Sequence, residues 1–149
     1  MDNRNPTILV VDDEPNNLRV LSTILTKHGY KVQKAIGGNL AVSAASTAPP
    51  DLILLDIMMP QINGYEVCKK LKSIDETRKI PVIFLSGLDQ TTDKVKAFES
   101  GGVDYITKPF QVDEVLARIE NQLTLRNLQK QLQKQNNYLQ QQIEARKQA

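Results

Sequence analysis

Five short apolar runs alternate with helix-like segments along the chain, and this alternation leaves few folds open to it. The runs are Thr7–Val11, Lys31–Ala35, Asp51–Leu55, Ile80–Leu85 and Val103–Ile106. Three of them contain an unbroken apolar stretch (ILVV, LILL and VIFL), which is typical of strands buried on both faces of a parallel sheet. The run over 31–35 alternates apolar and polar residues instead, which predicts a strand nearer an edge of the sheet.

Apolar residues at three- and four-residue spacing fill the gaps between these runs. They predict helices around residues 18–25, 40–48, 65–71, 95–98 and 112–123. Strand and helix therefore alternate five times, which implies right-handed crossovers between parallel strands. The predicted fold class is α/β: a five-stranded parallel sheet, doubly wound with helices on both faces, and a long C-terminal helix.

The end of the chain contains neither Gly nor Pro after Pro109, which predicts one continuous helix that leaves the domain. From residue 112 to 145 it would run roughly 50 Å at about 1.5 Å per residue. The apolar stripe over 112–123 should pack on the domain. A second stripe, out of phase with the first, follows heptad spacing and should seek another helix: Leu125, Leu128, Leu132 and Leu139. We expect a domain over 1–124 and a helical linker or coiled-coil extension over 125–149, with disorder of this Gln-rich tail as the alternative.

Composition excludes several classes of protein. The longest apolar runs fall well short of the roughly 18 residues of a membrane span, and the polar N-terminus has no secretory core. A single cysteine, Cys68, fits a reducing compartment, so we expect a cytoplasmic chain with no membrane partner. Residues 126–149 hold five Lys or Arg against Glu144 alone, but without a dense cationic cluster. We therefore expect a solvated helix face and no direct nucleic-acid binding.

Polar side chains follow four of the five predicted strands at the point where each ends. They are Asp12, Asp13 and Glu14 after the first strand, Asp56 after the third, Ser86 after the fourth, and Thr107 and Lys108 after the fifth. The carboxyl ends of parallel strands meet at one edge of a sheet, where ligands bind. Clustered carboxylates repel one another and favour a hard cation, so the pattern predicts Mg²⁺. Together with a lysine and a hydroxyl, they predict a site of phosphoryl transfer.

Each of these residues also has a structural explanation. The acids before Pro15 suit the start of a helix, Asp56 and Ser86 suit turns, and Lys108 suits a solvated loop. We favour a functional site over these separate explanations. Without a site, the polar groups at four strand ends would have to coincide by chance.

These residues complete a pattern that resembles the receiver domain of bacterial two-component response regulators, over residues 7–124. The matching segments are ILVVDDEPNN, DLILLDIMMPQINGYEVCKKLK, IPVIFLSG and GVDYITKPF. The resemblance implies a flavodoxin-like fold in which Asp56 is the phosphoryl acceptor.

The resemblance also implies roles for the other residues at this edge. The implied Mg²⁺ ligands are Asp12, Asp13, Asp56 and the backbone carbonyl of Met58. The implied switch and phosphoryl-contacting residues are Ser86, Tyr105 and Lys108, the last preceding a cis proline, Pro109. A tyrosine that merely packs in the core is the alternative for Tyr105.

By this resemblance the chain is a response regulator rather than an enzyme, although it promotes its own phosphorylation and dephosphorylation. A sensor histidine kinase or phosphotransfer protein would phosphorylate Asp56 in a Mg²⁺-dependent reaction. The signal would leave through the surface of the fourth helix, fifth strand and fifth helix and through the C-terminal helix. The expected partners are a second copy, joined in a parallel dimer through the leucine seam, and a downstream output module.

Two alternatives have other chemistry or none. An aspartyl-nucleophile phosphohydrolase would need a second carboxylate two residues after Asp56, where this chain has Met58. An inert receiver-like coiled-coil adaptor would have no need of Asp13, Asp56 and Lys108 together.

Overall fold

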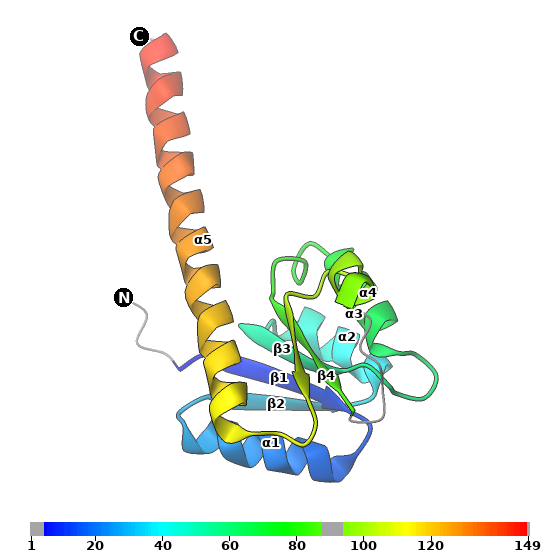
Figure 1. Ribbon diagram of the computed structural model, residues 1–149. Helices are drawn as coiled ribbons and strands as arrows, with labels where there is room; N and C mark the ends of the chain where they lie inside the picture. The colour runs from blue at the N-terminus through cyan, green and yellow to red at the C-terminus, as the bar shows by residue number, and fades with distance from the viewer. Residues whose placement is uncertain (1–4, 88–93, 149) are drawn as a thin grey trace.

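The computed structural model describes residues 5–87 and 94–148, and within these ranges strands and helices alternate as the sequence predicts (Figure 1). The strands form one parallel sheet in the order β2-β1-β3-β4-β5. They are β1 (Thr7–Asp12), β2 (Lys31–Ile36), β3 (Leu52–Asp56), β4 (Val82–Ser86) and β5 (Asp104–Thr107). The order runs outward from β1 in both directions, so the sheet is doubly wound, as predicted.

The burial of the strands follows their sequence patterns. All five residues of β3 and of β4 are buried, and these strands lie inside the sheet with β1. The alternating strand β2 is at the edge and buries only Ala35. The prediction that the unbroken apolar runs are interior strands and the alternating run an edge strand is confirmed.

Helices cover both faces of the sheet and create two separate apolar clusters (Figure 1). One face packs against α1 (Pro15–Lys27) and the first turns of α5 (Val112–Gln148). The other packs against α2 (Gly38–Thr47), α3 (Gly64–Lys72) and α4 (Lys94–Glu99). Side chains alternate along β1, so Ile8 and Val10 join the first cluster while Leu9 and Val11 join the second.

The expected apolar faces of two helices differ from those observed. In α4 the side chains of Val95 and Phe98 are 66% and 59% exposed, and Ala97 is the buried residue. A small residue at this contact lets the six-residue helix lie close to the sheet, which leaves its larger neighbours on the surface. In α5, Val112 is exposed, and Val115 and Ile119 form the buried stripe.

The C-terminal tail is helical, and α5 continues without interruption from the domain into it (Figure 1). All four leucines of the heptad seam are exposed by half or more of their surface: Leu125, Leu128, Leu132 and Leu139. The prediction of one continuous helix is therefore confirmed. The alternative prediction, a disordered tail, is wrong. No helix among the described residues combines the length and apolar character that crossing a membrane requires.

Candidate functional site

The carboxyl edge of the sheet brings three carboxylates together. Asp12 and Asp56 are the last residues of the neighbouring strands β1 and β3, and Asp13 follows Asp12 directly. One carboxylate oxygen from each of the three lies within 4.8 Å of the other two. Asp12 is fully buried and Asp56 is 2% exposed, so two of the three acids are shielded from water.

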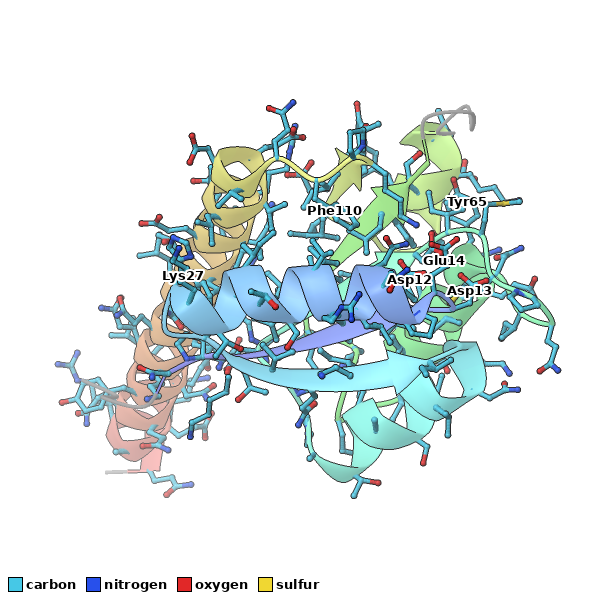
Figure 2. All side chains as sticks on the ribbon, turned by 90° about the horizontal axis from the view of Figure 1, so that it is seen from below. Asp12, Asp13, Glu14, Lys27, Tyr65 and Phe110 are labelled. Atoms are coloured by element: carbon cyan, nitrogen blue, oxygen red, sulfur yellow. The ribbon has the colours of Figure 1, made fainter. Side chains whose placement is uncertain are left out.

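The acidic segment before α1 is held by its own backbone. The amide of Glu14 donates to Asp12 Oδ1 at 3.0 Å, and Pro15 begins the helix. Glu14 is the N-cap residue, and its side chain makes no capping hydrogen bond. Figure 2 shows Asp12, Asp13 and Glu14 gathered at one end of α1, with Lys27 at the other. Asp12 and Asp13 thus group with Asp56, and neither is the N-cap residue of α1.

Lys108 supplies positive charge to this pocket. Its Nζ lies 3.3 Å from Asp12 Oδ2 and 3.4 Å from Asp56 Oδ1. The lysine follows β5, and its amide donates to the carbonyl of Ser86 at 2.7 Å. The peptide bond between Lys108 and Pro109 is cis.

One lysine does not balance two buried carboxylates. Burial, followed by repulsion from Asp12, raises the pKa of Asp56 to about 7, and Lys108 only partly opposes this shift. Burial lowers the pKa of Lys108, but Asp56 and Asp12 outweigh it and leave that pKa raised. Asp12 Oδ2 has no hydrogen-bond donor of good geometry among the described residues. An excess of buried acid, with one oxygen held in the described part of the chain only by the Lys108 ion pair, suits a hard divalent cation bound by oxygen.

The loop after β3 keeps the start of α3 against the acidic pocket. Asn63 caps α3 by accepting from the amide of Glu66 at 3.0 Å, and the amide of Gly64 donates to the carbonyl of Ile57. A side chain at Gly64 would collide with the carbonyl oxygen of Asp56, so this position requires glycine. Met58 lies in the same loop with its side chain 56% exposed.

The two switch residues expected from the resemblance lie in the last two strands, β4 and β5. Ser86 is the last residue of β4 and is 1% exposed. Tyr105 lies in β5, half-buried, and packs against the apolar cluster on the α2–α3–α4 face. The tyrosine thus has one face on the apolar cluster and is still partly open to solvent.

A salt-bridge network that the sequence analysis missed surrounds Tyr105. Arg118 of α5 lies 2.7 Å from Asp104 Oδ1 and 3.2 Å from Glu114 Oε1, and its guanidinium carbon is 5.9 Å from the centre of the Tyr105 ring. Asp104 Oδ1 also accepts from the Tyr105 amide at 2.8 Å. The pairing of Glu114 with Arg118 at i, i+4 is visible in the sequence, whereas the contact with Asp104 depends on how α5 packs beside β5.

Buried carboxylates and a lysine thus meet at the carboxyl edge of a doubly wound sheet, and this combination of fold and pocket identifies the class of protein. The family model described as response regulator receiver domain matches residues 8–120. This chain therefore belongs to the response regulator receiver domain family, as its motifs led us to expect.

Relatives of known name extend this finding. The chain is 44% identical over 114 residues to the "DNA-binding dual master transcriptional regulator RpaA" of Synechocystis sp., which covers 76% of this chain and 47% of the relative. It is 38% identical over 137 residues to a "probable cyclic di-GMP phosphodiesterase" of Vibrio cholerae, covering 92% of this chain and 31% of the relative. The chain thus spans less than half the length of either relative.

A solved structure that matches the fold holds a magnesium ion. It is the receiver domain of a sensor histidine kinase from Pseudomonas aeruginosa, with a magnesium ion coordinated in its active site cleft. The match has a TM-score of 0.74 at 28% identity and covers 80% of this chain and 98% of that one.

Proposed function

We propose that this chain works as a phosphorylation-controlled receiver in which Asp56 accepts the phosphoryl group. The observation that carries the proposal is the surroundings of Asp56: a buried carboxylate 3.4 Å from Lys108 Nζ and grouped with Asp12 and Asp13. Residues 1–124 would hold this chemistry, and 125–149 would form the extension through which it is read. The family match supports the phosphoacceptor role over a phosphohydrolase or an inert adaptor.

Asp12, Asp13 and Asp56 would hold Mg²⁺, and the family resemblance adds the backbone carbonyl of Met58. The excess of buried acid, in which Asp12 Oδ2 is held among the described residues only by its ion pair with Lys108, supports this assignment. When bound, Mg²⁺ supplies positive charge that keeps Asp56 ionised and offsets the charge of the incoming phosphoryl oxygens. The magnesium-containing relative supports the same choice of ion.

In the transfer step, a carboxylate oxygen of Asp56 forms a bond to phosphorus. The bond between phosphorus and the donor breaks, and the donor keeps its electron pair. A sensor histidine kinase or a phosphotransfer protein would be the donor in the cell. Lys108, now facing one carboxylate oxygen of Asp56, would pair with a phosphoryl oxygen of the product.

The product would be read first by Ser86 and then by Tyr105. A phosphoryl group on Asp56 would add acceptor oxygens beside the next strand end, where the buried Ser86 hydroxyl would donate a hydrogen bond to one of them. The inward movement of Ser86 changes the space available to Tyr105. Arg118 contacts the Tyr105 ring and salt-bridges Asp104 on the same strand, so a change at Tyr105 would be transmitted to α5.

The tail would act on a second copy and on an output module. The exposed seam of Leu125, Leu128, Leu132 and Leu139 supports a parallel dimer. Gln135 and Gln142 interrupt that seam, so we expect association in the micromolar range. The match to the phosphodiesterase relative runs over 137 residues and therefore into the tail, which supports a linker role toward a further module.

The test is labelling with acetyl phosphate and Mg²⁺, followed by intact-mass analysis. Wild type should gain one phosphoryl group that hydroxylamine removes, and Asp56→Asn should gain none. Asp75→Asn is the matched control, because Asp75 lies in the loop between α3 and β4 and its side chain is 88% exposed. Equal labelling of Asp56→Asn and wild type would remove Asp56 from its proposed role.

A further inference from the structure

Two adjoining cavities form a groove where α5 leaves the domain. One has a volume of about 340 Å³ and lies between α5, the α3–β4 loop and the α4–β5 turn. The other, of about 510 Å³, continues along α5. Lys79, Arg126 and Gln129 line both cavities, so the two form one continuous surface, which we call the exit groove.

The exit groove is strongly cationic. Five basic residues line it: Lys72, Lys79, Arg126, Lys130 and Lys134. No acidic residue is among the described residues that line either cavity. Three of the five follow one another on α5 at four-residue spacing and so share one face of the helix. Positive charge is thus concentrated in the exit groove, although the formal net charge of the whole chain is only +2.

Arg126 at the centre of the groove is incompletely satisfied. Its guanidinium donates to the carbonyl of Lys79, but its Nε is buried and has no hydrogen-bond partner among the described residues. Burial lowers the pKa of Arg126, and the negative charge of Asp51 opposes this only in part. Lys72 differs, because its Nζ donates to the carbonyls of Arg78 and Ile80 at 3.0 and 2.6 Å. Arg126 is therefore the groove residue whose hydrogen-bonding capacity is least satisfied.

One end of the groove is apolar. Phe98 is 59% exposed and Leu125 50% exposed, and Val103 and Pro81 line the same cavity. Phe98 thus presents an aromatic side chain beside a row of cations. A ligand that fits the whole groove has an apolar part at this end and negative charges along α5.

We propose that the exit groove binds an acidic amphipathic segment of a partner protein. Apolar side chains of the segment would cover Phe98 and Val103, and its carboxylates would pair with Arg126, Lys130 and Lys134. This interaction is separate from phosphoryl transfer, and it shares only Leu125 with the leucine seam.

Charge and shape favour this occupant over two others. A nucleic acid would use the cations, but the apolar end offers it a single exposed aromatic side chain, Phe98. A second copy would bring its own leucine seam, but three of the four seam leucines on this chain, Leu128, Leu132 and Leu139, do not line the groove. An acidic amphipathic segment would contact the apolar end of the groove with its apolar side chains and the cations on α5 with its carboxylates.

The probe is a fluorescein-labelled peptide of about 14 residues, or roughly four helical turns, with Leu and Phe on one face and Glu on the other. Fluorescence anisotropy with the full chain should show saturable, salt-sensitive binding. The same peptide with Lys in place of Glu should bind at least tenfold more weakly. Absence of saturation up to about 1 mM would overturn the proposal.

Paired charge reversals locate the binding. Lys130→Glu combined with Lys134→Glu should weaken binding of the acidic peptide at least tenfold. The control, Lys34→Glu combined with Lys147→Glu, changes net charge equally at exposed residues outside the groove and should weaken it less than threefold. Circular dichroism of both variants checks that the helix is intact. Equal effects of the two pairs would show nonspecific charge attraction and contradict the proposal.

The apolar end and the competing occupants need separate measurements. Phe98→Ala, at a surface position, should weaken peptide binding at least threefold. Single-stranded DNA of matched length should bind more weakly than the peptide, and stronger binding that depends on Lys130 and Lys134 would make the groove a nucleic-acid site instead. Sedimentation of the complex should show the oligomeric state of the free chain, and dissociation of a dimer by the peptide would make the groove a surface between copies.

Discussion

In the first half of α5, Val115 and Ile119 are fully buried against α1 and the sheet, whereas in the second half Leu132 and Leu139 are 58% and 56% exposed. Both halves belong to one uninterrupted helix, Val112–Gln148. The first half is stabilised by the domain on which it packs. The second half has fewer apolar residues, and none of them is buried by the part of the chain that the structure describes.

This difference assigns separate tasks to the two halves. An isolated helix is marginally stable in water, so a long protruding helix with exposed leucines gains from association with another helix. The first half contacts β5 through Arg118, which touches both Asp104 and Tyr105 on the strand that leads to Lys108. We therefore interpret α5 as the physical connection between phosphorylation of the domain and assembly of the tail.

The largest expected effect distinguishes the two halves by stability. Ile119→Ala should lower the free energy of unfolding by about 2–5 kcal/mol, because it leaves a cavity in a buried cluster. Leu132→Ala should change it by less than about 0.5 kcal/mol in dilute protein, because its side chain is exposed. Urea unfolding followed by circular dichroism measures both. Equal losses would mean that the tail is stabilised like the domain, and the comparison would fail.

A smaller effect concerns association through the tail. Leu128→Asn combined with Leu132→Asn should weaken dimerisation at least tenfold, or about 1.4 kcal/mol, because both changes place polar groups in the seam. Gln133→Asn, on another face of the same helix, is the control and should leave the dissociation constant within about twofold. Sedimentation equilibrium gives both constants. A wild-type chain that remains monomeric at about 100 μM would exclude this dimer.

A third prediction tests whether the acidic pocket binds Mg²⁺ without help from the tail. Asp13→Ala should weaken Mg²⁺ binding at least tenfold, about 1.4 kcal/mol, because it removes one of three grouped carboxylates. Glu14→Ala, the adjacent acid outside that group, should have a much smaller effect. Isothermal titration with the full chain and with residues 1–124 should give equal Mg²⁺ affinities. An unchanged affinity in Asp13→Ala would remove Asp13 from the metal site.

Much of the acidic pocket could be predicted from the sequence, because short-range residue patterns determine where its side chains lie. The unbroken runs ILVV and LILL identify β1 and β3 as interior strands, and parallel pairing then brings their last residues, Asp12 and Asp56, together. The same reasoning places Ser86 and Lys108 at this edge. Their chemistry follows from residue type, so the pocket required no knowledge of side-chain packing.

The parts that could not be predicted depend on contacts between distant segments. Arg118 with Asp104, and Arg126 with the carbonyl of Lys79, each join α5 to another element at a position that no periodicity marks. Phe98 looked like a core residue by spacing, but the neighbouring Ala97 makes the contact with the sheet. Helix packing decides such cases, and a sequence pattern shows only which faces are available.

The most direct test of this account measures whether the state of Asp56 reaches the tail. Dimer dissociation constants are determined by sedimentation for wild type with Mg²⁺, with and without beryllofluoride as a stable mimic of the phosphoryl group. We predict a change of at least fivefold, about 1 kcal/mol, which is the lower end of typical coupling between two sites. Asp56→Asn should show no change with beryllofluoride. Identical constants for wild type in the two states, with beryllofluoride bound, would contradict the claim that α5 connects phosphorylation to assembly.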